Sequence, residues 1–327
     1  MTLESAVNLN EPIWDLSKFQ GRLRYYAWIT DTRLTLIPTK TLYQYKDLVD
    51  YYSKNKSLPS GLTVADYRRA QQATLSAFHP DTGVLQNVIG RMSFQVPGGM
   101  VLCGCMVTFY RSPAAVVFWQ WTNQSFNAIV NYTNAPGCSS DTKKIMFAYV
   151  TATTSALVTA LGLKAFLAKN ASALLQRFVP FAAVAAANAV NIPLMRQNEI
   201  IDGVTVYDEN NKEVGKSKYA AMKGILQVFI SRLFIVTPCM TLIPPVMMRL
   251  EKYAWIKKYG RFVNAPLQVF FSGIFFVGCV PIGCALFNQR CSVTTERLKT
   301  VEPAAYEKMK MDLNGELPQR VFFNKGL

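Results

Sequence analysis

The sequence predicts an all-α, multi-span helical membrane protein with about five transmembrane helices, preceded by a more polar helical region in an aqueous compartment. Two observations favour this fold class. Of the 327 residues, 50% are hydrophobic and only 17% are charged, whereas soluble domains carry about 25% charged residues. The charges are also unevenly placed, since long stretches carry none although Lys and Arg outnumber Asp and Glu by 35 to 20. This composition excludes an ordinary soluble enzyme, a disordered chain and a small secreted scaffold.

Residues 1–91 form an N-terminal region in which charges of both signs are mixed with many aromatic residues. Glu4, Glu11 and Asp15 occur early, and no apolar signal-peptide core follows them. Cleaved mitochondrial presequences are rich in Arg and nearly free of acids. We therefore expect no cleaved presequence, and targeting by internal segments.

Residues 92–289 are expected to form the transmembrane bundle, and residues 290–327 a C-terminal tail. A spanning helix needs about 20 mostly apolar residues. Five segments meet this need, near residues 97–120, 145–166, 176–195, 225–248 and 266–287. In the first segment Arg111-Ser112-Pro113 offers an alternative, because proline interrupts the helical hydrogen-bond ladder. Residues 97–134 then form either one span or a re-entrant hairpin.

The loop charges predict an orientation. Five spans place residues 1–91, 164–177 and 249–261 on one side of the membrane. The third of these segments carries Arg249, Lys252, Lys257, Lys258 and Arg261 against Glu251 alone. Short basic loops stay on the side of synthesis. The N-terminal region is therefore expected on the inner face, which in a mitochondrion is the matrix.

The seven cysteines and the single histidine do not suggest a metal site. No Cys-x-x-Cys occurs, and Cys103, Cys105, Cys279 and Cys284 lie in apolar runs, where cysteine usually behaves as a small hydrophobe. We expect no disulfide framework, metal or cofactor. The chain also lacks a glycine-rich nucleotide-binding loop. Its basic residues flank the spans, as topology and anionic lipid require, so nucleic acid is not an expected partner.

Six amide side chains recur at three- and four-residue steps shortly after Pro113. They are Gln120, Asn123, Gln124, Asn127, Asn131 and Asn134. On a helix they form one stripe, and amides can bind the ammonium and carboxylate groups of a zwitterion without burying a protein charge. The stripe is therefore a candidate substrate path. Two structural alternatives stay open, namely hydrogen bonding between helices and the wet face of an interfacial helix.

The segment His79-Pro80-Asp81-Thr82-Gly83 precedes the first span and has the residues of a tight turn. A functional alternative makes His79 and Asp81 a proton relay or gate, since histidine titrates near pH 6.5. The turn is favoured, because one histidine without a nucleophile or metal partner gives little support for catalysis.

A second candidate site lies at the end of the third span, where Asn188 and Asn191 are one turn apart and Pro193 follows. Pro193 can free backbone carbonyls, as the broken helices of many transporters do. The alternative is an ordinary helix end. Arg111 and Arg232 lie at or inside spans, so either could hold a substrate carboxylate. For Arg232, however, snorkelling to the interface is favoured.

Short motifs follow one another along almost the whole chain. They are Trp14-Asp15, Phe19-Gln20-Gly21-Arg22, His79–Gly83, Asn87–Gln95, Pro97–Met100, the amide-rich stretch Phe118–Asn134, Asn191–Arg196 and Asn324–Leu327. In their order and number they resemble the sideroflexin family of mitochondrial multi-span proteins. One departure is Thr32, where the family usually has proline, and it affects only a local turn.

The resemblance implies a transporter, not an enzyme, that carries serine and other small neutral amino acids across the mitochondrial inner membrane for one-carbon metabolism. It also implies an indirect link to iron homeostasis and haem biosynthesis. Two alternatives remain: a non-transporting membrane scaffold for iron and haem metabolism, and a membrane enzyme that uses His79 and Asp81. An odd number of spans excludes a simple even inverted repeat. A homo-oligomer or a re-entrant element is therefore expected to complete the pathway.

Overall fold

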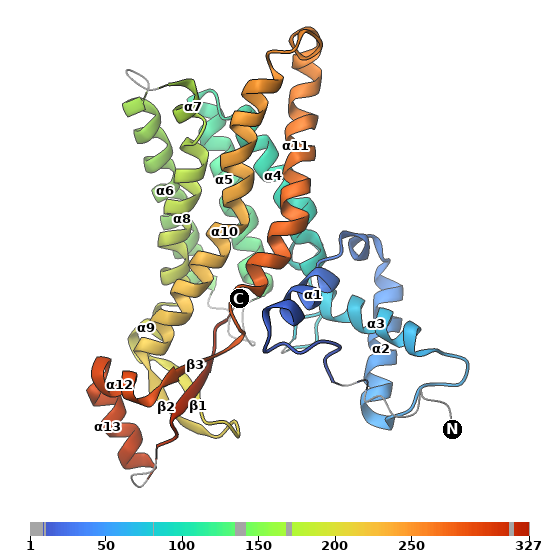
Figure 1. The fold of residues 1–327 in the computed structure, drawn as a ribbon, viewed down its shortest axis with the longest axis vertical. Helices are drawn as coiled ribbons and strands as arrows, with labels where there is room; N and C mark the ends of the chain where they lie inside the picture. The colour runs from blue at the N-terminus through green and yellow to red at the C-terminus, as the bar shows by residue number, and fades with distance from the viewer. Residues whose placement is uncertain are drawn as a thin grey trace.

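The computed structural model describes residues 9, 11–80, 82–134, 142–167, 172–313 and 317–326. In these residues, six helices run along the long axis of the molecule and pack into a ring (Figure 1). They are α4 (Gln95–Phe109), α5 (Pro113–Thr133), α6 (Thr142–Leu167), α8 (Val179–Met195), α10 (Lys218–Leu250) and α11 (Ala254–Ala285). Each packs against the next in this order, and α11 closes the ring against α4. The predicted helical multi-span class is confirmed.

Helix length and composition identify the candidate membrane spans among the described residues. Four helical segments are long and apolar enough to cross a bilayer: Met92–Phe109, Met146–Leu167, Lys218–Leu250 and Phe262–Ala285. Helix α8 is apolar but has only 17 residues. Helix α5 has 21 residues and carries the amide stripe. Large apolar side chains, including Phe147, Val158 and Ile274, are exposed on the outside of these helices, as a lipid-facing surface requires.

The prediction of one continuous span near 97–120 is wrong. Helix α4 ends at Phe109, and α5 begins at Pro113. Proline is well suited to the first position of a helix, where no backbone N–H is needed. The Ser112 hydroxyl caps α5 by accepting a hydrogen bond from Ala115 N at 3.2 Å. The segment therefore forms the alternative hairpin, whose two arms contact each other.

Small residues bring the bundle helices close together. On α6, Ala148, Ala152, Ala156 and Ala160 follow at four-residue steps and are completely buried. This helix packs along α8, whose Ala183 and Ala187 are also buried. With no side chain beyond Cβ, alanine lets two helix backbones approach, which favours van der Waals packing in a bilayer.

The N-terminal region folds on the lower end of the ring (Figure 1). Its helices are α1 (Phe19–Ile29), α2 (Thr39–Asn55) and α3 (Val64–Ala77). Helices α2 and α3 bury Leu42, Ala73 and Ala77 between them. Helix α1 lies against the end of α11, where Arg22 Nε donates a hydrogen bond to the carbonyl of Ala285 at 2.9 Å.

The segment expected to be a C-terminal tail is instead part of a folded unit. Strands β1 (Val204–Tyr207), β2 (Glu213–Ser217), β3 (Arg290–Thr294) and β4 (Arg320–Asn324) form an antiparallel sheet in the order β2-β1-β4-β3. With α12 (Thr295–Val301) and α13 (Pro303–Asp312) they enclose a core that includes Val206, Leu298 and Phe323. Short α9 (Gln197–Asp202) joins this unit to α8.

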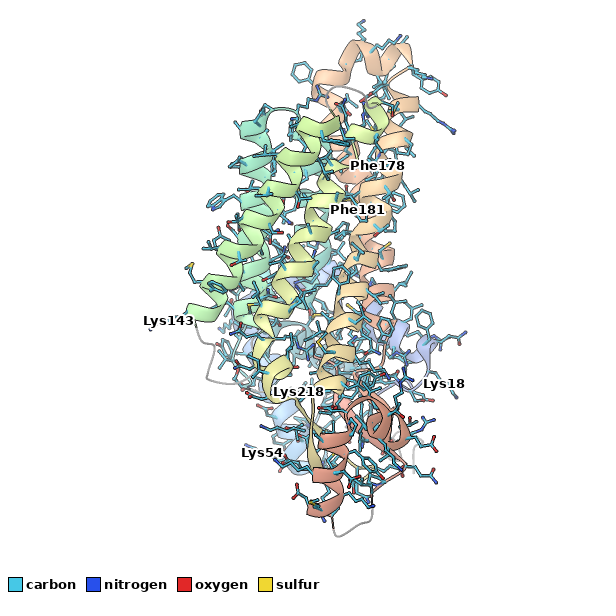
Figure 2. The ribbon with its side chains drawn as sticks, turned by 90° about the vertical axis from the view of Figure 1, so that its left-hand side faces the viewer. Lys18, Lys54, Lys143, Phe178, Phe181 and Lys218 are labelled. Carbon is cyan, nitrogen blue, oxygen red and sulfur yellow. A yellow bond between two sulfur atoms is a disulfide. The ribbon has the colours of Figure 1, made fainter. Side chains whose placement is uncertain are left out.

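The arrangement of the helices overturns the loop grouping on which the predicted orientation rested. Figure 2 places Phe178 and Phe181 at the upper end of α8, and Lys143 and Lys218 at the lower ends of α6 and α10. Lys18, in the N-terminal region, also lies low (Figure 2). The N-terminal region and the C-terminal sheet therefore share the lower end, and the start of α8 and the basic turn that joins α10 to α11 lie at the upper end.

The cysteines also depart from expectation at one position. Cys103 of α4 and Cys239 of α10 are joined in a disulfide, which links residues 136 positions apart in the sequence. Of these two, Cys103 had been interpreted as a small hydrophobe in an apolar run, and no disulfide was expected. Among the described residues, Cys105, Cys279, Cys284 and Cys291 are free thiols.

Candidate functional site

Helix α5 carries most of its amides toward the interior of the bundle. Gln120 and Gln124 are buried, and Asn123, Asn127 and Asn131 are half-buried. On the opposite face, the aromatic side chains of Trp121 and Tyr132 are exposed. The stripe exists because amide and apolar residues alternate with the period of a helix.

Several polar atoms near the bundle interior have no hydrogen-bond partner among the described residues. They are Gln120 Oε1, Asn123 Nδ2 and Gln124 Nε2 on α5, and Ser231 Oγ on α10. The amide nitrogen of Gln120, Nε2, donates a hydrogen bond to the Tyr110 hydroxyl at 2.7 Å. Because buried polar atoms in proteins are nearly always hydrogen-bonded, these groups are available to bond a polar solute.

Arg232 connects the stripe to α10. Its Nη2 donates a hydrogen bond to Asn131 Oδ1 at 3.1 Å, which joins α5 and α10, helices that are not neighbours in the ring. No described Asp or Glu forms an ion pair with Arg232. A guanidinium has five N–H donors and favours carboxylates, which it binds bidentately. The structure gives Arg232 a partner on another helix, which the snorkelling interpretation did not include.

The last amide of the stripe has a structural role. Asn134 Oδ1 accepts from Gln86 Nε2 at 2.7 Å, and its Nδ2 donates to the carbonyls of Val130 and Gly90 at 2.9 Å and 3.2 Å. These bonds tie the end of α5 to the segment that leads into α4. The interhelical alternative therefore applies to this residue.

The second candidate group lies on α8. Asn188 and Asn191 are both buried, and Asn188 Nδ2 donates to the Val184 carbonyl of its own helix at 3.0 Å. Pro193 lies in the last turn of α8, which continues to Met195, so the expected break of this span does not occur. Proline still leaves the carbonyl of Ala189 without the donor that residue 193 would supply. In the part of the chain that the structure describes, no hydrogen bond joins these amides to the stripe on α5.

The remaining predicted site residues lie at the two ends of the bundle. Arg111 is exposed in the upper turn between α4 and α5, away from the interior. His79 is buried at the lower end in a turn, where its Nδ1 accepts from Thr82 N at 3.2 Å and Gly83 N donates to its carbonyl at 2.9 Å. Asp81 lies outside the described residues, so the proposed relay stays a prediction.

A second polar line, on α11, was not predicted. Gln268 Nε2 donates to Asn264 Oδ1 at 2.8 Å, and Ser272 Oγ donates to the Gln268 carbonyl at 2.8 Å. At the upper end of this line, Asn264 Nδ2 donates to Glu251 at 3.3 Å, and Arg177 forms an ion pair with the same carboxylate at 2.9 Å. The signal was present in the sequence, because these three polar residues occur at four-residue steps in an apolar helix.

The end of the chain reaches the lower mouth of the ring, which the sequence did not indicate. Lys325 is 3% exposed, and its carbonyl accepts from Arg196 Nη1 at 2.7 Å. Its ammonium group lies over the Phe287 ring, 5.9 Å from the centroid. Burial lowers the pKa of Lys325.

Comparison with known proteins decides the family. The model of the family described as SFXNs, sideroflexins, matches residues 8–327. The chain belongs to the sideroflexin family. This sideroflexin is 48% identical to Sideroflexin-2 of Drosophila melanogaster over 326 residues, 99% of each chain. It is 47% identical to human Sideroflexin-2 over 324 residues, 99% of this chain and 98% of the relative.

Relatives named Sideroflexin-1 are similar to a comparable degree. The sideroflexin chain is also 47% identical to Sideroflexin-1 of Rattus norvegicus over 322 residues, 98% of each chain. No solved structure matches it. The family match therefore includes the N-terminal region, the ring and the C-terminal sheet. The apolar helices make this sideroflexin a multi-pass membrane protein.

Proposed function

We propose that this sideroflexin transports small neutral amino acids, serine foremost, across the mitochondrial inner membrane. The observation that carries the proposal is the contact that Arg232 of α10 makes with Asn131, on the same stripe of α5 as amide atoms two to three turns away that have no partner in the described residues. Polar residues at membrane depth are costly and usually serve a transport path.

The chemistry of the site suits a small zwitterion. The Arg232 guanidinium can bind the carboxylate of an amino acid, for which it has donors to spare. The amide oxygens of the stripe can accept hydrogen bonds from its ammonium group and from a serine hydroxyl. With no described acid paired to Arg232, a ligand without a carboxylate leaves this cation uncompensated, which is unfavourable. Facilitated exchange, with no coupled energy source, is the simplest mechanism for such a path.

The cellular role follows from the family resemblance. We propose that the transported serine supplies mitochondrial one-carbon metabolism and that the link to iron homeostasis and haem biosynthesis is indirect. Among the described residues, no group of three or more His, Cys, Asp or Glu side chains is placed to hold a metal ion. The alternative, a non-transporting scaffold for iron and haem metabolism, assigns no use to the polar atoms inside the ring.

Uptake of radiolabelled serine into liposomes that contain the purified protein tests the proposal. We expect saturable uptake that is lost in the Asn127→Leu/Asn131→Leu variant and retained in Tyr132→Leu, a control on the exposed face of α5. Unchanged uptake in the double variant would exclude the stripe as the path. If neither serine, alanine nor cysteine enters faster than into empty liposomes, the scaffold replaces the transporter.

A further inference from the structure

A basic pocket of about 300 Å³ lies outside the ring, between the start of α10 and the C-terminal sheet. Tyr219 and Lys223 line it from α10, Ser292–Thr294 from β3, Arg297 from α12 and Arg320 from β4. The lining therefore has three cations and no acid. Hydroxyl groups of serine, threonine and tyrosine complete a wall made largely of hydrogen-bond donors.

The positive charge of this pocket is not neutralised by neighbouring acids. No ion pair in the described part of the chain includes Lys223, Arg297 or Arg320. Lys223 Nζ donates to the Ser292 carbonyl at 2.9 Å, which fixes the side chain without cancelling its charge. Three unpaired cations on a concave surface concentrate positive potential and attract an anion.

The carboxylate of Glu302, on the neighbouring segment, bonds to hydroxyl and backbone donors and not to a cation of the pocket. Glu302 accepts hydrogen bonds from Ser217 Oγ at 2.7 Å, from Lys218 N at 3.0 Å and from Tyr219 N at 3.2 Å. It thereby caps the N-terminus of α10. Glu296 is adjacent to Arg297 on α12 and exposed, and successive helical residues do not face each other.

The pocket lies where the lipid-facing surface begins. Met222, Leu226 and Ile230 follow at four-residue steps on α10 and are 51%, 56% and 40% exposed. This apolar stripe starts one residue before Lys223. Helix α10 has 33 residues, about 50 Å at 1.5 Å per residue, whereas the hydrocarbon layer is about 30 Å thick. The helix is therefore long enough for its first turns to reach the headgroup layer, where tyrosine and basic residues are favoured.

We propose that this pocket binds the phosphate group of an anionic phospholipid. Arginine and lysine supply charge-assisted hydrogen bonds to phosphate oxygens, and basic pockets beside transmembrane helices commonly hold anionic headgroups. The acyl chains of the lipid lie along Met222, Leu226 and Ile230. The site is independent of the proposed transport path, because it lies on the outer surface and shares no residue with it.

Native mass spectrometry of the detergent-solubilised full chain tests the site. Phosphatidylglycerol and phosphatidylcholine with identical acyl chains are the lipid probes, and inorganic phosphate is the soluble probe. We expect the protein to prefer phosphatidylglycerol, and Lys223→Gln/Arg297→Gln/Arg320→Gln to bind it about 100-fold more weakly, since each basic residue near anionic lipid contributes roughly fivefold. The charge-matched control Lys212→Gln/Lys308→Gln/Lys310→Gln changes exposed lysines outside the pocket and should bind as wild type.

Three results would overturn the proposal. The first is equal loss of phosphatidylglycerol in both triple variants, which would indicate a general charge effect. The second is equal binding of the two lipids by the wild-type protein. The third is displacement of the lipid by millimolar inorganic phosphate, which would assign the pocket to a soluble phosphate compound. The variant Arg297→Lys, which keeps the charge, should retain binding and guards against misfolding as an explanation.

Discussion

Asn131 and Asn134 are one turn apart on the same helix, and they differ in what surrounds them. The side chain of Asn134 forms hydrogen bonds with Val130 of α5 and with the segment before α4, whereas Asn131 accepts a hydrogen bond from Arg232 on a distant helix. The sequence predicted both as members of one stripe, because spacing fixes the face of a helix. It could not predict their partners. Arg232 and Asn131 are 101 residues apart.

Replacing Asn134 should therefore affect stability and leave transport intact. In Asn134→Ala, Gln86 and the carbonyl of Gly90 lose their partners, and we expect the free energy of unfolding to fall by about 2 kcal/mol. Thermal unfolding in detergent and serine uptake per folded protein measure the two effects. Loss of uptake in the folded variant would place Asn134 on the path instead.

At the scale of single elements, hydropathy predicted the long helices because a run of apolar residues is a local property. Helices α6, α8, α10 and α11 overlap the segments expected near 145–166, 176–195, 225–248 and 266–287. The segment Arg111-Ser112-Pro113 indicated that a hairpin of α4 and α5 was possible. Hydropathy alone could not distinguish this hairpin from a single span. The short strands were missed, since pairing β1 with β4 depends on residues more than 100 positions apart.

Two glycines in the bundle should respond in opposite ways to alanine. A Cβ on Gly104 of α4 would lie 2.6 Å from the Cα atom of Val269 on α11, whereas a Cβ on Gly162 of α6 would meet nothing within 4 Å. We expect Gly104→Ala to lower stability by about 1–3 kcal/mol through overpacking. Gly162→Ala should raise it by roughly 0.5–1 kcal/mol. If the melting temperatures of the two variants changed in the same direction, this result would contradict the tight α4–α11 contact.

The first turn of α3 should be sensitive to acid. Thr63 Oγ1 and Thr63 N donate to Asp66 Oδ2 at 2.6 Å and 2.9 Å, and these bonds lower the pKa of Asp66. A lowered folded-state pKa contributes stability that is present above the unfolded value, about 3.9, and is lost as pH falls through the folded value. We expect hydrogen-exchange protection of residues 64–67 to decrease below about pH 4. In Asp66→Asn this pH dependence should disappear, and its persistence would assign it to another carboxyl group.

At the scale of the whole molecule, both ends of the described chain lie on the same side of the ring (Figure 1). At the other end, the turns and the helix ends beside them carry five basic residues, Arg111, Arg177, Arg249, Lys252 and Lys257. The sequence-based grouping failed because it counted residues 97–134 as one crossing, and a second crossing reverses the side of the N-terminal region. If the positive-inside rule is applied to the observed arrangement, we expect the upper turns, and not the N-terminal region, on the matrix side.

Epitope tags at the N- and C-termini should therefore be accessible from the same side, which we expect to be the intermembrane space. Protease treatment of mitochondria before and after opening of the outer membrane measures this. Both tags should be cleaved once the outer membrane is opened, while an internal matrix protein stays protected. Tags on opposite sides would show that α4 and α5 do not both cross.

We propose that Arg232 and Asn131 act together on a transported amino acid, and a double-mutant cycle of serine uptake into liposomes measures their coupling. We expect Arg232→Met to lower uptake about 100-fold, as for loss of a charged partner worth roughly 2–3 kcal/mol. Adding Asn131→Leu should lower it little further, because groups that act as a unit are not additive. The control Arg249→Met, exposed at the opposite end, should transport normally. Wild-type uptake by folded Arg232→Met protein would contradict the account.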